Sequence, residues 1–298
     1  MEDFFRDITK TNLENANVVL VGIPFDKNAS LGKGASYAPL YLRSLSKNIP
    51  GVSKDAKVLD KVRLFDYGDI KEKGNESVIK YFVRVEKEVG PLFNKKHLSL
   101  FLGGDHSVNI PLFKAFLSFC KQEGKTPVLI HIDAHPDIMD EYLGNAYSHA
   151  TPTRRALESG LEKDNLVFIG LRGFEVEEVH YFNENKDIKV YLASDVKKEG
   201  IKKISEEVIS KYKSDKYALY ISYDIDANDP SFAPGTGTPE AFGLSSDETL
   251  YLVNALISLK NTYALDMVEI SPPLDTNDIT SWLALKTIYE IFYTVGER

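Results

Sequence analysis

The sequence predicts an α/β protein built around one parallel sheet, and two observations support this prediction. Apolar runs rich in Val, Ile and Leu alternate with longer segments whose apolar residues recur at helical spacing. No long linker, internal repeat or low-complexity segment interrupts the alternation, so we expect one domain over residues 1–298. Alternating strands and helices favour a parallel sheet covered by helices on both faces, and a closed barrel of eight strands would show the same alternation.

Eight segments are expected to form strands, because each is a short apolar run bounded by turn residues. The first is closed by Gly22 and Pro24, and the fourth opens the stretch 128–138 (VLIHIDAHPDI), around which the rest of the chain is organised. The expected strands are residues 17–24, 63–69, 98–104, the opening of 128–138, 165–172, 189–193, 217–225 and 262–271.

Helices are expected between these strands, over residues 39–45, 75–89, 110–123, 151–159, 200–213, 246–260 and 278–293. Gly124 and Gly160 follow two of them and suit C-terminal caps, since glycine adopts the left-handed conformation without strain. Ser246 and Asp278 open the last two helices as N-cap residues, because their side-chain oxygens can accept hydrogen bonds from free backbone N–H groups.

Composition narrows the class of protein. The formal net charge of −8 argues against nucleic acid as a partner, because phosphate binding requires a basic surface, and it suits a cationic small substrate. The single cysteine, Cys120, excludes an intramolecular disulfide and fits a reducing compartment. The N-terminus has no signal-peptide pattern and no apolar run is long enough for a membrane span, so a cytoplasmic protein without membrane contact is expected.

The fourth strand leads into Asp133-Ala134-His135-Pro136-Asp137, where three side chains of metal-ligand type stand at every second position. On an extended backbone alternate side chains point the same way, so Asp133, His135 and Asp137 can converge at the carboxyl end of the strand. Pro136 donates no backbone hydrogen bond, so the chain should turn away there. Open α/β sheets bind ligands at this edge. In isolation, the same residues could equally form a solvated acidic turn.

Two other strand ends carry the same kind of side chain. The third strand ends in Asp105-His106 and the seventh in Asp224-Ile225-Asp226. Each fragment alone could be a cap or an acidic turn, but three of them at one edge of a parallel sheet indicate a shared site. Two imidazoles and four carboxylates exceed the ligand set that one zinc prefers, and they suit two harder ions such as Mn²⁺ that lower the pKa of a shared water. The expected metal ligands are His106, Asp133, His135, Asp137, Asp224 and Asp226.

Three further features lie beside this expected site. Residues 233–239 (APGTGTP) form a tightly specified loop, which either walls a pocket or is a rigid turn. Glu269, near the end of the eighth strand, could pair with a guanidinium in fork geometry or be a solvated carboxylate. His149, after the fourth strand, could transfer protons or be a surface histidine. No ligand spacing is found for His97, His131 or His180.

Three motifs together resemble the ureohydrolase family, which includes arginase, agmatinase and formimidoylglutamase. They are GGDHS at residues 103–107, DAHPD at 133–137 and SYDIDANDPSFAPGTGTPE at 222–240. The resemblance implies a three-layer α/β/α sandwich around an eight-stranded parallel sheet, which favours the open sheet over the barrel. It also implies a binuclear Mn²⁺ centre that hydrolyses a guanidino group to urea and an amine, and a homo-oligomer, either a trimer or a hexamer.

The resemblance assigns a role to each site residue. The metal ligands of the family correspond to the six residues His106, Asp133, His135, Asp137, Asp224 and Asp226. Its guanidinium-binding glutamate corresponds to Glu269 and its proton-transferring histidine to His149. In outline, an activated water attacks the guanidinium carbon, Asp137 protonates the leaving amine, and His149 relays protons.

Agmatinase is the member of the family that the chain resembles most, because YSHATPTRRALE at residues 147–158 is similar to the agmatinase segment after the metal-binding strand. Arginases carry an Asn- and Ser-bearing loop there, which this chain lacks, and Glu175 stands in a different context from their aspartate for the α-amino group. Pro136, residues 241–243 and the loop 28–34 depart from the common pattern. These departures bear on the substrate rather than on the reaction.

The expected reaction is therefore hydrolysis of agmatine, a cationic guanidino compound, to putrescine and urea. Arginine, another guanidino acid, a formimino compound or an amide are alternative substrates for the same metal centre. Deacetylases that share this architecture fit less well, because their single zinc does not need six ligands. A non-enzymatic alternative is a protein that binds polyamines or metal ions.

Overall fold

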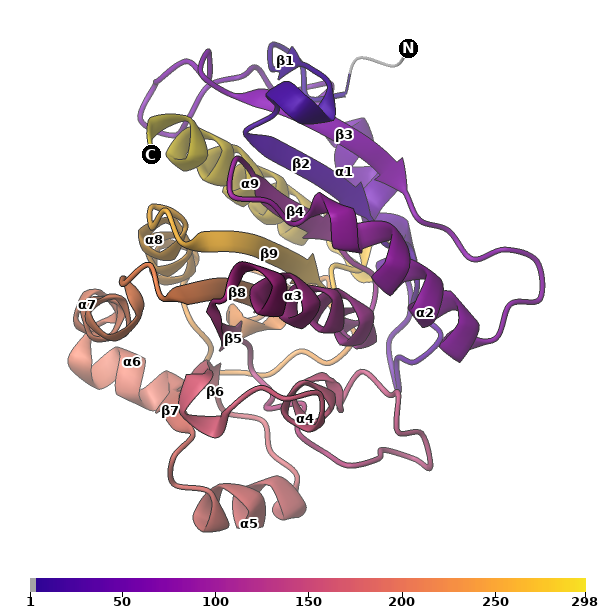
Figure 1. Cartoon of the computed structure of the whole chain (residues 1–298), viewed down its shortest axis with the longest axis vertical. Helices are drawn as coiled ribbons and strands as arrows, with labels where there is room; N and C mark the ends of the chain where they lie inside the picture. Colours follow the sequence, from indigo (N-terminus) through magenta and orange to yellow (C-terminus); the bar gives the residue numbers. More distant parts are fainter. Residues whose placement is uncertain (1–3) are drawn as a thin grey trace.

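The computed structural model describes residues 4–298, whose strands are β1 (Thr9–Lys10), β2 (Val18–Gly22), β3 (Arg63–Asp69), β4 (Leu98–Leu102), β5 (Thr126–Ile132), β6 (Leu166–Leu171), β7 (Lys189–Leu192), β8 (Tyr217–Asp224) and β9 (Thr262–Val268). All of them pair in parallel within one sheet, in the order β1-β3-β2-β4-β9-β8-β5-β6-β7 (Figure 1). The outermost strands β1 and β7 do not pair with each other, so the sheet is open and is not a barrel.

All eight expected strands are present, and the structure adds β1 at one edge of the sheet. Thr9 and Lys10 of β1 pair with Arg63 and Leu64 of β3. Two residues are too few to show the alternation by which a strand is recognised in a sequence. The expected count of eight is therefore corrected to nine, without a change in fold class.

The helices form two layers, one on each face of the sheet. The first layer comprises α1 (Ala38–Ser46), α6 (Ala193–Glu199), α7 (Ile201–Tyr212), α8 (Ser246–Ile257) and α9 (Ile279–Glu297). The second comprises α2 (Val78–Val89), α3 (Asn109–Glu123), α4 (Pro152–Glu158) and α5 (Val176–Glu184). The expected three-layer α/β/α arrangement is therefore present (Figure 1). Short 3-10 turns occupy Leu13–Asn15, Ala35–Tyr37, Gly90–Leu92, His106–Val108, Lys163–Asn165, Ile225–Ala227 and Pro272–Leu274.

Two of these helices, α5 and α6, lie in stretches where the sequence pattern indicates no helix. Within α5 the buried residue is Glu178, while Val176 and Val179 are exposed. Helix α6 has only seven residues. Neither therefore shows the apolar stripe by which an amphipathic helix is recognised.

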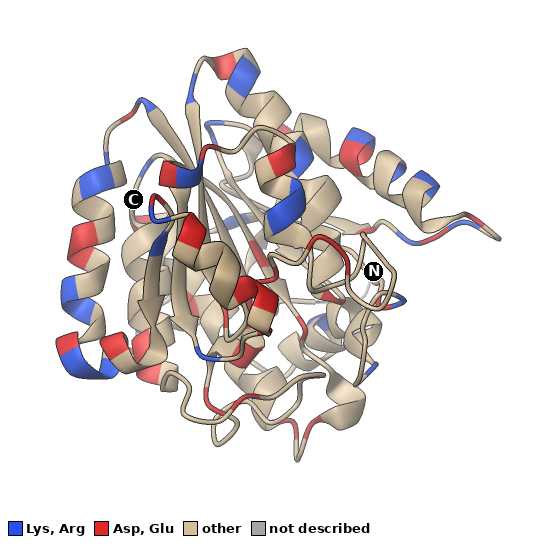
Figure 2. Cartoon of the chain, turned by 90° about the horizontal axis from the view of Figure 1, so that it is seen from below, with Lys and Arg blue, Asp and Glu red and all other residues tan. Residues whose placement is uncertain are grey.

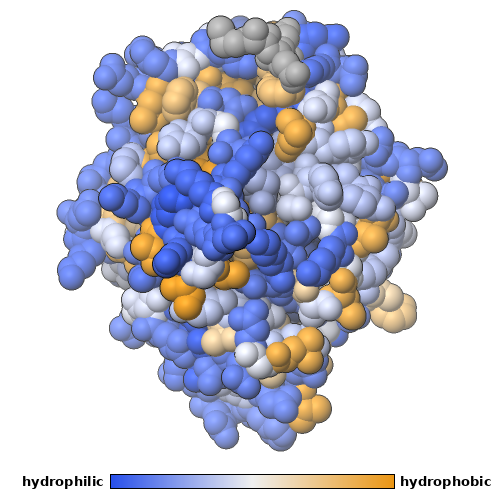
Figure 3. All heavy atoms as spheres, turned by 90° about the vertical axis from the view of Figure 1, so that its right-hand side faces the viewer, coloured by the Kyte–Doolittle hydropathy of each residue, from blue (hydrophilic) through white to orange (hydrophobic). Residues whose placement is uncertain are grey.

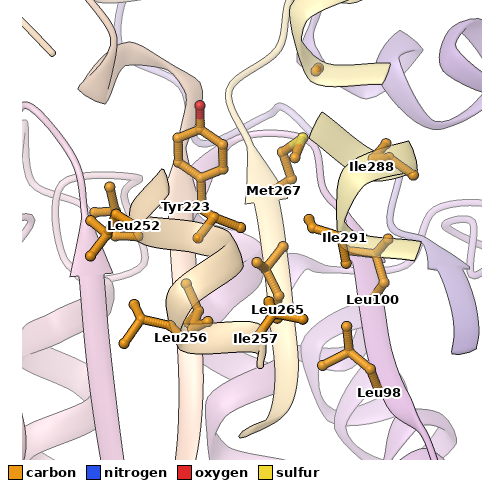
Figure 4. Packing of buried hydrophobic residues seen from close by; sticks show 14 of the residues in the cluster. Leu98, Leu100, Tyr223, Leu252, Leu256, Ile257, Leu265, Met267, Ile288 and Ile291 are labelled. Atoms are coloured by element: carbon orange, nitrogen blue, oxygen red, sulfur yellow. The ribbon is translucent and has the colours of Figure 1, made fainter. Parts of the chain in front are cut away.

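Strand side chains alternate between two hydrophobic cores, one under each helix layer. In β2, Val18 and Leu20 belong to the core under the first layer, and Val19 and Val21 to the core under the second. Figure 4 shows the first core, where side chains of α8 and α9 pack on β4, β8 and β9. Replacing one of these buried leucines, such as Leu265, by alanine is expected to cost about 2–5 kcal/mol.

Both expected glycines end their helices, one as the C-cap residue and the other one residue beyond it. Gly124 has a φ of 63° and caps α3. Helix α4 ends at Glu158 with Ser159 as its C-cap, so Gly160 lies one residue beyond the cap. In that position Gly160, with a φ of 110°, ends the helix, because its N–H donates to the Leu157 carbonyl and the Leu161 N–H donates to the Ala156 carbonyl, both at 3.1 Å.

The N-caps of the last two helices differ from the expectation in detail. Ser245 and not Ser246 caps α8, because its hydroxyl accepts the backbone N–H of Glu248. Asp278 occupies the N-cap position of α9, but its carboxylate accepts a hydrogen bond from the Tyr41 hydroxyl. The free N–H groups of α9 at Thr280 and Ser281 donate instead to the carboxylate of Asp275.

Charged residues lie mostly on the outer helices and loops (Figure 2). Strands β4, β5 and β6 carry none, as expected for strands that are covered on both faces, whereas β8 carries Asp224 and β9 carries Asp266. Polar clusters at the ends of such strands are therefore exceptional and need an explanation of their own. No helix within residues 4–298 combines the length and the apolar character needed to pass through a membrane.

Candidate metal centre

Four neighbouring strands end at the candidate site. Strands β4, β9, β8 and β5 are consecutive in the sheet and parallel, so their carboxyl ends lie together at the edge on the right of Figure 1. Figure 3 looks onto this edge, which is largely hydrophilic with small hydrophobic patches. His106 follows β4, Glu269 follows β9, Asp224 ends β8, and Asp133 follows β5. The strand order therefore brings together the fragments that the sequence places far apart.

Around His106 the structure brings together three carboxylates from two other strand ends. His106 Nδ1 lies 3.0 Å from Asp133 Oδ2, 3.0 Å from Asp137 Oδ2 and 3.1 Å from Asp224 Oδ2. All four residues are buried. One imidazole nitrogen and three carboxylate oxygens therefore face a common point, as the ligands of a metal ion do.

A second cluster surrounds His135. Its Nδ1 lies 3.1 Å from Asp226 Oδ2 and 3.7 Å from Asp133 Oδ1. Asp133 thus directs one oxygen to each cluster. The six residues that the sequence suggests as ligands therefore lie in two adjoining clusters that share Asp133. Two groups of side chains are close enough to hold a metal ion, one made by His106, Asp133 and Asp137 with His131, the other by Asp133, His135 and Asp226.

The hydrogen bonds behind His106 show that its Nδ1 faces the carboxylates as a lone pair. The Ser222 hydroxyl donates to Asp266 Oδ1 at 2.7 Å, so Ser222 Oγ can only accept from His106 Nε2, 2.8 Å away. A neutral His106 then carries its hydrogen on Nε2. In the described part of the chain, His106 Nδ1 and Asp133 Oδ2 are buried and have no hydrogen-bond partner. A divalent cation would satisfy both atoms, so the residues present fit a metal ion.

The protonation preferences of the cluster lead to the same conclusion. Burial lowers the pKa of His106, but the carboxylates of Asp133, Asp137 and Asp224, which would accept a hydrogen bond from a protonated ring, raise it well above its usual value. Burial and the neighbouring carboxylates Asp226 and Asp133 raise the pKa of Asp224 well above the normal range. For Asp226, burial and Asp133 raise the pKa to about 6. The cluster therefore attracts positive charge, which bound cations supply without protonating the carboxylates.

Two of the proposed functional residues have unusual backbone conformations. Asp137 has a φ of 52° and Glu269 a φ of 59°, which few residues other than glycine adopt. The Asp137 conformation is held by Thr153, whose hydroxyl donates to the Asp137 carbonyl at 2.7 Å, and by Glu178, which accepts the Ile138 N–H at 3.2 Å. Strain retained at such positions is typical of functional sites.

Glu269 and His149 lie side by side next to the first cluster. Glu269 Oε1 accepts the backbone N–H of His106 at 2.9 Å and lies 3.0 Å from His149 Nδ1. Both side chains are almost fully buried, so the interpretations as a solvated glutamate and as a surface histidine are wrong. Burial lowers the pKa of His149, but the hydrogen bond and the charge of Glu269 raise it to about 9.

A pocket of about 320 Å³ opens from the clusters to the surface. His135, Asp137 and Glu269 lie among the residues that line it, together with loop and helix residues further out. The loop 233–239 contributes Gly237 to Pro239, so it forms part of the pocket wall. The part of the lining beyond the two clusters, called here the outer half, carries three carboxylates, those of Glu175, Glu178 and Glu240. No Lys or Arg among residues 4–298 lines it.

The sequence pattern missed one residue of the site, His131. Its Nε2 lies 2.9 Å from Asp133 Oδ2 and 3.1 Å from the carbonyl oxygen of His135, and its ring stacks on His106 with 4.8 Å between centroids. The alternation of β5 places His131 on the same face as Asp133, which is a signal that could have found it. The stack with His106 could not be found in this way, because His106 follows β4, which is not adjacent to β5 in the sheet.

Comparisons with known proteins show what the chain is similar to. The sequence profile of the arginase family matches residues 16–293. The chain is 32% identical to a guanidinobutyrase of Pseudomonas aeruginosa, over 94% of this chain and 86% of that protein. It is also 32% identical to an agmatinase of Halalkalibacterium halodurans, over 95% of this chain and 94% of that protein. The solved structure of the agmatine ureohydrolase of Thermoplasma volcanium is similar with a TM-score of 0.85 and 32% identity, over 100% of this chain and 95% of that one.

Proposed function

The chain belongs to the arginase family, and from this premise we propose that it is a binuclear manganese hydrolase that converts agmatine and water to putrescine and urea. Membership of the family supports the reaction class, a hydrolysis of guanidino compounds. Identity does not separate the substrates, because a guanidinobutyrase and an agmatinase are equally similar to the chain. The choice of agmatine is carried by the acidic outer half of the pocket.

We assign the metal ions to the two clusters. One ion would be held by His106, Asp137 and Asp224, and the other by His135 and Asp226. Asp133 would be a ligand of both ions. Two imidazole nitrogens and four carboxylates are a ligand set that suits Mn²⁺. When bound, the ions would supply a water of lowered pKa that is nucleophilic near neutral pH.

Glu269 is proposed to bind the guanidinium group. Its Oε1 already accepts from His106 and faces His149, so a guanidinium N–H can donate to Oε2. The substrate is then held beside both clusters, with its carbon open to attack by water. The charge of Glu269 also balances the positive charge that the substrate brings into a buried site.

The proton transfers are assigned to Asp137 and His149. Water adds to the guanidinium carbon, and the tetrahedral intermediate collapses when the C–N bond to the alkyl chain breaks. The neutral leaving nitrogen needs two protons to become an ammonium group, and the attacking water loses two. Asp137 faces the same point as the His106 cluster and is placed to carry one proton, while His149 supplies the other from the pocket side.

The distal end of the substrate is proposed to be an amine. Glu175, Glu178 and Glu240 line the outer pocket, and among residues 4–298 no Lys or Arg lines it. A primary ammonium group is attracted by this arrangement, whereas the carboxylate of a guanidino acid would be repelled without a cationic partner. Agmatine carries an ammonium group at this end, and guanidinobutyrate carries a carboxylate.

The cellular setting is also a proposal. We infer a cytoplasmic homo-oligomer, a trimer or a hexamer, in which the product serves polyamine biosynthesis. The single cysteine, Cys120, is buried and free, which fits a reducing compartment. Light scattering of the purified protein tests the oligomer, and a monomer at micromolar concentration would contradict it.

The test of the function is urea release by the purified protein loaded with Mn²⁺. Agmatine, arginine, guanidinobutyrate and guanidinopropionate are compared side by side, and metal analysis counts the bound ions. We expect agmatine to give the highest kcat/KM and about two ions per chain. Urea from a guanidino acid alone would overturn the substrate assignment, and no urea from any compound with two ions bound would overturn the reaction.

A further inference from the structure

His149 is held at both of its ring nitrogens. Nδ1 lies 3.0 Å from Glu269 Oε1, and Nε2 lies 2.8 Å from Ser30 Oγ. The backbone N–H of Ser30 also donates to Nε2, at 3.2 Å. Ser30 belongs to the loop between β2 and α1 and lines the same pocket as His149. His149 therefore contacts Glu269, at the end of β9, through one ring nitrogen and Ser30, in a loop much earlier in the chain, through the other.

The two contacts differ in what they allow. A carboxylate only accepts hydrogen bonds, so Nδ1 keeps its hydrogen while Glu269 is ionised. Protons must then enter and leave the ring at Nε2. There the Ser30 backbone N–H can only donate, whereas the Ser30 hydroxyl can donate to a neutral ring and accept from a protonated one. Only the hydroxyl is compatible with both states of His149.

We propose that the hydroxyl of Ser30 is the link through which His149 exchanges protons with the substrate pocket. This proposal rests on the proposed function, because the leaving amine is the group that needs the proton. His149 Nε2 gives its proton to Ser30 Oγ while the hydroxyl proton of Ser30 passes to the amine nitrogen, whose lone pair is released as the C–N bond breaks. Ser30 ends unchanged and His149 becomes neutral. Together with the proton that Asp137 carries, this proton converts the leaving nitrogen to an ammonium group.

Burial makes an acceptor at Nε2 necessary. His149 is 9% exposed, so a protonated ring has little access to water. The titratable groups that face it are Glu269 at the end of β9, Asp137 after β5 and Asp105 after β4, and all three favour the charged ring. The hydrogen bond and the charge of Glu269 favour the protonated ring most among these groups. A buried N–H without an acceptor would be costly, and Ser30 Oγ at 2.8 Å provides one.

The loop that carries Ser30 is tied to the site on both sides. The Asn28 carbonyl accepts the backbone N–H of His149 at 3.3 Å, and the Asn28 N–H donates to Asp105 Oδ2 at 2.9 Å. The Asn28 side chain also donates to Ser107 Oγ at 3.1 Å. Ser30 therefore keeps its place relative to His149 through backbone contacts, so removal of its hydroxyl should not displace the loop.

The kinetic test compares Ser30→Ala, Ser30→Thr, His149→Asn and the double variant Ser30→Ala with His149→Asn. We expect Ser30→Ala to lower kcat for agmatine about 10- to 100-fold while KM stays within about twofold. Ser30→Thr keeps a hydroxyl and should restore most of kcat. Ser118→Ala, on the exposed face of α3, is the matched control and should behave as the native protein.

The double variant separates a role through His149 from a general effect. If Ser30 acts only through His149, Ser30→Ala should change kcat less than about twofold in the His149→Asn background. A kcat of Ser30→Ala equal to that of the native protein, or an equal loss in both backgrounds, would overturn the proposal. Equal metal content and equal melting temperature of all variants exclude damage to the fold or to the metal clusters.

A second readout does not depend on activity. Nitrogen-15 NMR of labelled histidines follows the titration of His149 in protein loaded with Cd²⁺, which is diamagnetic. Without the hydroxyl the protonated ring loses its acceptor while the Ser30 N–H still stabilises the neutral ring, so the midpoint should fall by one pH unit or more. An unchanged midpoint would overturn the link between Ser30 and His149. A shifted midpoint in a protein that releases no urea would instead contradict the proposed function alone.

Discussion

The inner and the outer half of the pocket are built in different ways. The inner half consists of buried side chains at the ends of β4, β5, β8 and β9, whose partners come from neighbouring strands. The outer half consists of loop residues and the start of α5, such as Leu31, Tyr142 and Glu240, several of which are exposed. A rigid sheet edge suits groups that must hold metal ions and move protons, while loops can vary with the substrate. Under the proposed function, the reaction class therefore depends on the strand ends and the substrate choice on the loops.

The largest effect is expected from Asp137→Asn in the inner half. Asp137 Oδ2 lies 3.0 Å from His106 Nδ1, so the variant loses both a proposed ligand and a proton carrier. We expect kcat/KM for agmatine to fall at least about 1000-fold, with less bound metal. Urea release and metal analysis measure both, and Asp140→Asn, at an exposed carboxylate, is the control. Full activity of Asp137→Asn would show that the inner half is not the reaction centre.

The second-largest effect is expected from a change at His131, which contacts the proposed ligands and tests how far the inner half extends. His131 lies 2.9 Å from Asp133 and stacks on His106, so His131→Phe keeps the stack and removes the N–H. We expect the affinity for Mn²⁺ to fall about 10- to 100-fold, as for other groups that orient metal ligands. Equilibrium dialysis against graded Mn²⁺ measures it, with His180→Phe on α5 as the control. An unchanged affinity would limit the metal centre to its six proposed ligands.

A smaller effect concerns Glu178, which joins the two halves because it accepts the N–H groups of Ile138 and Glu175. Burial raises the pKa of Glu178 to about 7, against about 4.3 in an unfolded chain. Between these values the folded state binds more protons than the unfolded state, so this group contributes stability at low pH that is lost as pH rises through 7.

Glu178→Gln should therefore flatten the dependence of stability on pH. We expect the free energy of unfolding of the native protein, relative to the variant, to fall by about 1–3 kcal/mol between pH 4.5 and 7.5. Urea denaturation at several pH values measures it, and Glu177→Gln, an exposed neighbour, is the control. The same slope in the native protein and in Glu178→Gln would contradict the assignment of the titration to Glu178.

The smallest effect is expected at the rim. Glu240 Oε1 lies 3.7 Å from His135 Nε2, and its side chain is 44% exposed, so its charge is largely screened by water. Glu240→Gln should raise KM for agmatine about two- to fivefold, because exposed charges contribute up to about 1 kcal/mol. KM for guanidinobutyrate should fall or stay the same, with Glu158→Gln as the control. A large loss of kcat instead would place Glu240 in the inner half.

The sequence by itself predicted the eight main strands, seven of the helices and the candidate ligands. Short apolar runs bounded by turn residues mark segments that are covered on both faces, and these runs predicted the eight main strands. The spacing of Asp133, His135 and Asp137 marked them as candidate ligands. However, β5 ends at Ile132 and Asp137 has a φ of 52°, so their convergence does not come from an extended chain. Each of the six proposed ligands stands at a strand end, and the parallel sheet predicted that they would meet.

Only the tertiary structure decided the strand order, the exposed helix α5, and the contacts of His131 and Ser30 with the site. The adjacency of β4, β9, β8 and β5 depends on how helices pack across the whole sheet, and no local pattern reports that. The positive φ values of Asp137 and Glu269 are imposed by partners distant in sequence, among them Thr153, and contradict local preference. Local patterns record the environment of one residue at a time, whereas a site depends on the relative positions of elements, which long-range packing determines.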